Sequence, residues 1–230
     1  MTDASLAHVL ARLSVVEARV RRAVALRRST DPNPDDPFRG LYLSDEAVAL
    51  VLDAERGPLV PDALEVDRLH VAEQSADAAG TDLRLRRLAV DFGLSPLDVE
   101  VLLLALAPDV DPRFEQLYGY LNDDVTRRRA SAGLALTLCG GATGSAAARA
   151  VFAAGSALVA GGLVVVEDQD RPLLSRGLRV PDRVTDHLLG GDHADPAAKT
   201  ARAAAEPVAP PHSVSASPAL ALRRVTSSFK

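Results

Sequence analysis

One stretch of the chain, residues 97–107, is almost entirely apolar and reads LDVEVLLLALA. Ser95 and Pro96 precede it and favour a helix start, because a serine hydroxyl caps free N–H groups and proline is tolerated at the first helical position. A helix that is apolar on most sides is stable in water only when other elements surround it. The sequence therefore predicts a buried central helix, ended by Pro108.

The core around this helix must be aliphatic. The chain has 230 residues, of which 47% are hydrophobic but only 3% aromatic, and it has no Trp. This length is enough for one good core or two small ones. A single cysteine, Cys139, excludes an intramolecular disulfide and a zinc–thiolate cluster. The stretch around Cys139 is apolar and offers no evident basic neighbour, which predicts an inert thiol in the core.

The net charge and the N-terminal sequence restrict the class of partner and the cellular compartment that we expect. The net charge is −5, so duplex DNA repels the chain overall unless a local basic patch compensates. The N-terminal sequence MTDASLAHVLARL is not a secretory signal, and we expect a cytoplasmic protein. Glycines interrupt the apolar stretch 130–166, which favours short buried helices over a membrane span.

Residues 1–30 are predicted to form one amphipathic helix, because apolar residues recur there at steps of three and four. Arginines occupy its other faces: Arg12, Arg19, Arg21, Arg22, Arg27 and Arg28. Two interpretations are open. The helix packs on the rest of the domain, or residues 1–29 pair with a partner or with a second copy of the chain.

A helical N-terminal part with a proline-rich loop is predicted for residues 31–92. The loop, 30–40, reads TDPNPDDPFRG. Helices are expected at about 44–55, 65–77 and 82–92, and the last of them ends at Gly93, a residue typical of the position after a helix.

Residues 93–190 are predicted to form a winged-helix-like domain. Helices at about 111–123, 131–139 and 145–154 precede two strands, 163–166 and 173–180, and a short last helix. The two strands would form the wing, and the helix at 145–154 would enter a DNA groove in a DNA-binding protein of this kind. That helix offers only Arg149 to a guanine and no Asn or Gln to an adenine, so it is a poor reader of bases.

The predicted fold is therefore mainly α, with a helical N-terminal part, a winged-helix-like domain with one β-hairpin wing, and a disordered C-terminal tail. The tail, 191–230, is rich in Ala, Pro and Ser and shows no periodicity.

Motifs of catalysis are missing from this sequence. The glycine cluster at 140–145 lacks the lysine of a Walker A loop, the histidines have no metal-ligand spacing, and no G-x-S-x-G is present. We expect no catalytic, cofactor-binding or metal-binding residues, and no enzyme activity.

Two groups of residues are candidates for partner binding. Arg127, Arg128 and Arg129 form the sharpest charge cluster, which could instead make local ion pairs with the neighbouring aspartates. The second group lies in the proline-rich loop and could instead anchor that loop to the core. It comprises Phe38, Arg39 and Tyr42.

Three segments carry a resemblance to a known family. They are DPFRGLYLSDEAV (36–48), LAVDFGLSPLDVEVLLLALAPDVDPRFEQLYGYLNDDVTRRR (88–129) and LVAGGLVVVEDQDRPLLSRGLRVPDRVTDHLLG (158–190). Together they resemble the N-terminal, variant winged-helix region of bacterial AAA family ATPases, some of which occur with contractile injection systems. The resemblance implies a role in positioning the motor, recognising a client or aiding assembly. It does not imply ATP hydrolysis, because no residue here matches the Walker A or Walker B motif of the ATPase module.

Two functional hypotheses follow. The first is a non-catalytic protein-interaction domain whose partner is a protein client or a AAA motor module. The second is a winged-helix DNA-binding regulator. The acidic charge and the poor reading helix favour the first and disfavour a nucleic-acid partner.

Overall fold

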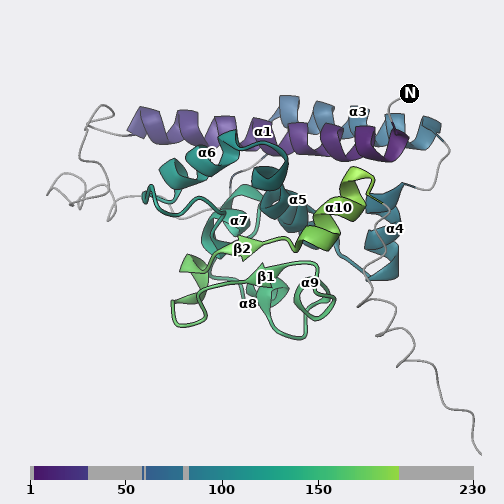
Figure 1. Cartoon of the computed structure of the whole chain (residues 1–230). Helices are drawn as coiled ribbons and strands as arrows, with labels where there is room; N and C mark the ends of the chain where they lie inside the picture. Colours follow the sequence, from purple (N-terminus) through teal and green to yellow (C-terminus); the bar gives the residue numbers. More distant parts are fainter. Residues whose placement is uncertain (1–2, 31–58, 60, 80–82, 192–230) are drawn as a thin grey trace, which may run out of the picture. The chain divides into compact units, whose positions relative to one another are not determined.

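The structure is a computed structural model, and it describes residues 3–30, 59, 61–79 and 83–191. Helices dominate this part of the chain, together with one antiparallel pair of strands (Figure 1). The mainly α fold with a single hairpin is thereby confirmed. Several expectations fall outside the described residues, namely the proline-rich loop with Phe38, Arg39 and Tyr42, the helix at 44–55, and the tail from residue 192 onward.

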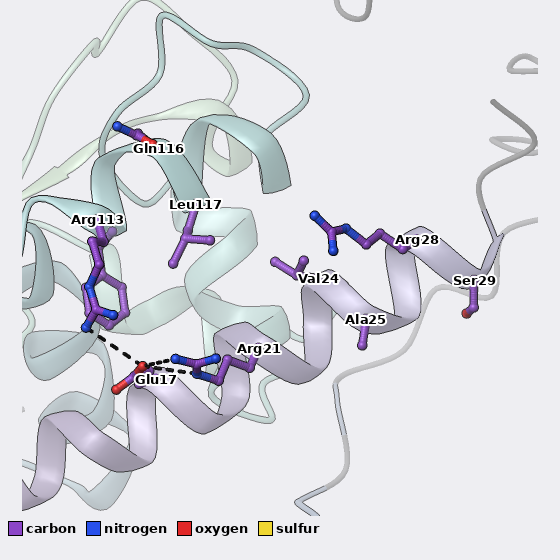
Figure 2. Close-up of a pocket in the computed structure, with 10 residues that line it drawn as sticks. Glu17, Arg21, Val24, Ala25, Arg28, Ser29, Arg113, Gln116 and Leu117 are labelled. Carbon is purple, nitrogen blue, oxygen red and sulfur yellow. Dashed lines mark hydrogen bonds and ion pairs between the residues drawn. The ribbon is translucent and has the colours of Figure 1, made fainter. Parts of the chain in front are cut away.

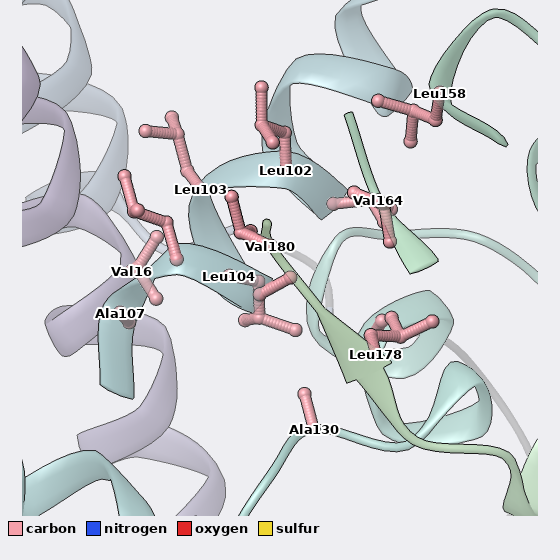
Figure 3. Close-up of a cluster of buried hydrophobic side chains, with 14 of the residues drawn as sticks. Val16, Leu102, Leu103, Leu104, Ala107, Ala130, Leu158, Val164, Leu178 and Val180 are labelled. Carbon is pink, nitrogen blue, oxygen red and sulfur yellow. The ribbon is translucent and has the colours of Figure 1, made fainter. Parts of the chain in front are cut away.

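The central helix is α5, Pro96–Val110. Its start is a capping box, in which the Asp98 backbone N–H donates to the Ser95 hydroxyl at 3.2 Å and the Ser95 N–H donates to the Asp98 carboxylate at 2.8 Å. The side chains from Val101 to Ala107 are almost completely buried. Figure 3 shows Leu102, Leu103 and Leu104 among residues from α1 and from the hairpin. One hydrophobic cluster thus joins both ends of the described chain.

Helix α5 continues past the proline that was expected to end it. Pro108 lies inside the helix, and because proline has no N–H, the carbonyl of Leu104 loses its usual helical donor. The hydroxyl of Tyr118, in α6 (Arg113–Leu121), donates to that carbonyl at 2.8 Å. Burial raises the pKa of Tyr118, so its hydroxyl keeps its proton and remains a donor. The expectation that Pro108 closes the helix was therefore wrong, because a side chain replaces the missing backbone donor.

Helix α1, Ala4–Thr30, and helix α3, Ala63–Ala79, lie side by side and antiparallel over α5 (Figure 1). The apolar stripe of α1 is buried within this chain, as the first interpretation of the N-terminal helix predicts. Its members are Val9, Leu13, Val16, Val20 and Ala23. Helix α3 buries little besides Glu65, Ala72 and Ala76, so its contact with α1 depends heavily on polar groups.

Ion pairs connect α1 with α3 and α5. Arg19 of α1 bonds to both Glu65 of α3 and Glu100 of α5, and Arg12 bonds to Glu100 and, at 2.6 Å, to Glu73. Arg19 is 7% exposed and Glu65 is 3% exposed. The placement of these arginines on outer faces was thus wrong for Arg19. A buried charge requires such partners, since leaving it unpaired would cost several kcal/mol, about 3–5.

Glycines set the ends of the flanking helices. Helix α4, Arg84–Asp91, is followed by Gly93 with φ of +62°, a conformation that glycine adopts without strain. The helix thus ends where the sequence predicted, at Gly93. The last helix, α10 (Asp182–Leu189), ends in the same way at Gly190, where φ is +103°.

The region expected as one helix at 145–154 is broken into shorter pieces. Helix α7, Ala132–Leu138, precedes it as predicted. Helix α8 spans only Ala146–Arg149 and tightens into the 3₁₀ turn η1, Ala150–Phe152. A further short helix, α9 (Ala157–Ala160), begins where the hydroxyl of Ser156 accepts from the backbone N–H of Val159 at 3.3 Å. The cap at Ser156 therefore starts a new helix, α9, instead of a continuation of α8 and η1.

The wing is a short hairpin. Strand β1, Val165–Val166, pairs antiparallel with β2, Leu178–Arg179. The predicted second strand was too long, because residues 173–175 form the 3₁₀ turn η2, which packs against α7. Gly133 of α7 permits this contact, since a Cβ there would lie 2.9 Å from the Leu174 carbonyl oxygen.

A third segment extends the hairpin. The backbone N–H of Leu178 donates to the Ala130 carbonyl, and that of Ala132 donates to the Arg176 carbonyl, each at 2.9 Å. Ser131 and Gly177 form the bridge between these two bonds. The chain before α7 is thus fixed to the base of the wing.

We predict that Tyr118→Phe lowers the free energy of unfolding by about 1–3 kcal/mol, because it leaves the buried Leu104 carbonyl without a donor. Adding Pro108→Ala should recover part of this loss, since alanine restores the backbone N–H. Urea unfolding followed by circular dichroism measures both effects. Equal losses for Tyr118→Phe and the double variant would contradict the assignment.

We also predict that stability falls as the pH falls. Partial burial raises the pKa of Glu73, but hydrogen bonds from Arg86 and Arg12 outweigh it and hold this pKa at about 2 instead of 4.5. Burial lowers the pKa of His8 below 6.5. Both groups take up protons more readily in the unfolded chain, so stability declines below pH 6.5 through His8 and between pH 4.5 and 2 through Glu73.

Urea unfolding at a series of pH values checks this decline. Glu73→Gln should lower the free energy of unfolding by roughly 1 kcal/mol at neutral pH, because solvent screens this partly exposed carboxylate. It should also flatten the decline below pH 4.5. Asp67→Asn, an exposed site on the same helix, is the matched control. Parallel pH curves for the wild type and Glu73→Gln would refute the role of Glu73.

Candidate functional site

The predicted arginine cluster follows α6, and each of its members has a carboxylate of the same chain within ion-pair distance. Arg127 lies 3.1 Å from Asp124, Arg128 lies 3.5 Å from Glu115, and Arg129 lies 3.9 Å from Glu167. The pair of Arg127 agrees with the interpretation of local ion pairs with neighbouring aspartates, whereas the pairs of Arg128 and Arg129 are with glutamates from elsewhere in the sequence. These pairs do not bring the three guanidinium groups together on one ligand. Phe38, Arg39 and Tyr42, the second predicted group, lie outside the described residues.

A first hollow lies between the η1 region and the hairpin, where a winged helix would meet DNA. Its volume is about 500 Å³, and its polar lining residues are Arg149, Gln169 and Arg176. Arg149 donates to the Thr143 carbonyl at 3.2 Å. Arg176 donates to the side chain of Gln169 at 2.8 Å and to its carbonyl at 2.9 Å. Both cations are therefore already engaged with neighbouring groups.

A second and larger hollow, of about 840 Å³, lies between the C-terminal half of α1 and helix α6 (Figure 2). We call it the α1–α6 groove. Its lining from α1 consists of Glu17, Arg21, Val24, Ala25, Arg28 and Ser29. Its lining from α6 consists of Arg113, Phe114, Gln116 and Leu117. Aliphatic and aromatic side chains thus form the floor, and arginines stand around it.

Contacts at both ends hold the two helices in this arrangement. At one end Glu17 lies 3.8 Å from Arg113. At the other end Arg27 donates to the Leu121 carbonyl at 3.1 Å, lies 2.6 Å from the Asp123 carboxylate, and stacks over the Tyr120 ring at 5.2 Å. Arginine over an aromatic face adds to the ion pair. These contacts connect the two walls of the groove at both of its ends.

The charge of the α1–α6 groove is positive. Glu17 accepts from Arg21 at 2.6 Å and also faces Arg113. A hydrogen bond to Asp111 raises the pKa of Arg113, so this guanidinium stays charged. Among the described residues, no carboxylate lies within ion-pair distance of Arg28, which is exposed. The lining therefore contains three arginines and a single carboxylate.

The sequence did not reveal this groove. Val24 follows the apolar spacing of the N-terminal helix, and Leu117 is an apolar residue of the helix predicted at about 111–123. Neither pattern indicates that the two helices would lie side by side. A usable signal was present in Arg21, Arg28 and Arg113, which border apolar residues on both helices.

Cys139 follows α7 and lies close to Arg19 of α1. Burial raises the pKa of the Cys139 thiol to about 12, and the nearby Arg19, which lowers it, does not offset the burial. The inference that this cysteine lacks a basic neighbour was wrong, because Arg19 comes from a helix far away in the sequence. The thiol still has little thiolate character at neutral pH.

Metal sites and membrane-spanning helices are two further features that the described residues lack. Within the described ranges, no group of three or more His, Cys, Asp and Glu side chains is arranged to hold a metal ion. No helix of the described part combines the length and the apolar character needed to cross a membrane.

Comparison with known proteins gives one match. A family model described as "Winged helix domain, variant" matches residues 3–200, which include α1, the central helix and the hairpin. No curated protein and no solved structure matches the chain. Because the family model covers most of the 230 residues, the chain belongs to the winged helix domain variant family.

Proposed function

We propose that this chain is a non-catalytic protein-interaction domain that works in the cytoplasm. It would position or recruit a client for a AAA family motor module, as the resemblance of its three segments implies. The observation that supports this proposal is the α1–α6 groove, whose apolar floor between two helices is a surface on which an amphipathic protein segment can dock. The domain would act by binding, and any chemistry would belong to a motor whose motifs this sequence lacks.

The alternative function, a DNA-binding regulator, has less support from helix α8 and the hairpin, which would contact the DNA. Helix α8 spans only Ala146–Arg149, about one turn, and a helix that short can present few side chains to a major groove. Arg149 and Arg176 already donate to groups of this chain. The net charge of −5 adds a general repulsion from phosphates.

Binding measurements on the full chain separate the two functions. We predict a flat fluorescence anisotropy titration with a mixed-sequence DNA duplex at low salt. We further predict that the immobilised chain retains a protein partner from a host extract, and that an Arg149→Ala/Arg176→Ala variant retains it equally well. DNA binding that saturates, weakens steeply with salt and disappears in this variant would overturn the proposal.

A further inference from the structure

We infer that the α1–α6 groove binds an acidic amphipathic helix of a partner protein. This inference rests on the proposed function and specifies its ligand. It is carried by an apolar floor and a positive rim, formed by Arg21, Arg28 and Arg113, on two helices that contact each other at both ends of the groove.

The floor suits the apolar face of a helix. Leu117 and Val24 point into the space between the two helices (Figure 2), and the small side chain of Ala25 also belongs to the lining. Two neighbouring helices form a furrow in which side chains of a third helix can interdigitate. Helices bound in this way anchor residues at i, i+3 or i+4, and i+7. Phosphates of a nucleic acid would leave such a floor without apolar contacts.

The rim selects the charge of that helix. Arg21 bonds to Glu17, Arg113 bonds to Asp111 at 2.6 Å and also faces Glu17, and Arg28 has no carboxylate partner among the described residues. Carboxylates that flank the apolar face of a bound helix would reach these guanidinium groups. A helix with lysines at those places would instead meet charges of its own sign.

The same charge argues against a second copy of this chain as the occupant. A two-fold symmetric contact would place the groove of one copy against that of the other. Arg28 would then approach the positive rim of the other copy, and the charges would repel one another. Self-association through residues 1–29 is therefore an outcome that would contradict the inference.

The test uses the full chain and a designed, fluorescein-labelled helix of about five turns. This peptide has leucines at i, i+3, i+4 and i+7 and glutamates beside them. Two control peptides replace the glutamates by lysines or the leucines by serines. We expect anisotropy to rise only with the glutamate–leucine peptide. Equal binding of the lysine peptide, or no binding of any peptide, would overturn the inference.

Variants then locate the binding. Arg28→Glu should weaken the glutamate–leucine peptide by about fivefold or more, because it replaces an attraction by a repulsion. Ala25→Glu should weaken it similarly without harming the fold, since Ala25 is exposed and glutamate favours helices. Arg171→Glu changes the net charge equally at an exposed position of the wing loop and should have little effect. Equal weakening by Arg28→Glu and Arg171→Glu would overturn the inference.

Two measurements distinguish this inference from the proposed function. Sedimentation of the wild type and Arg28→Glu reports self-association, and a dimer that Arg28→Glu dissociates would refute the acidic-helix ligand. If a host partner is retained equally by the wild type, Arg28→Glu and Ala25→Glu, the groove assignment fails while the proposed function stands. If the chain binds DNA and no protein, the proposed function itself fails.

Discussion

The need to bury α5 on all sides governs this fold. Its side chains from Val101 to Ala107 leave no face for solvent, and removing such apolar surface from water is the dominant favourable term in folding. Helix α1 covers one side, and α6, α7 and the hairpin cover others. The bond from the Tyr118 hydroxyl to the Leu104 carbonyl completes this enclosure, since it supplies the one helical donor that Pro108 cannot give.

Helix α1 serves three neighbours at once. Its apolar stripe faces the core, its buried Arg19 joins carboxylates of α3 and α5, and its C-terminal half forms one wall of the α1–α6 groove. A helix of 27 residues is long enough to divide these tasks along its length as well as around its circumference. The proposed binding surface is therefore built on the same helix that covers the core.

Much of the fold could be predicted because local signals determined it. Ser95 and Pro96 marked the start of α5, Gly93 and Gly190 marked helix ends, and β-branched residues marked the first strand. The errors arose where a distant partner decided the outcome. Tyr118 allowed the helix to continue past Pro108, Glu65 and Glu100 drew Arg19 inside, and contact with α7 folded residues 173–175 into a turn.

The binding surfaces were harder to predict for the same reason. Arg127, Arg128 and Arg129 stood out because they are adjacent in the sequence, yet each faces a carboxylate. The arginines around the α1–α6 groove come from two helices that are separated by more than 80 residues, so no local window contains them together.

The way α3 is attached has a consequence for the dynamics of the molecule. Its buried apolar contribution is small, chiefly Ala72 and Ala76, and much of its attachment to α1 runs through Glu65 and Glu73. Segments with few buried apolar contacts open locally at a lower free energy than the core around α5. Backbone amides of α3 should therefore exchange with solvent deuterium well before those of α5. Transient opening of α3 would remove Glu73 from Arg12 and Glu65 from Arg19 and leave both arginines to Glu100 of α5, so the surface of α1 would briefly become more basic.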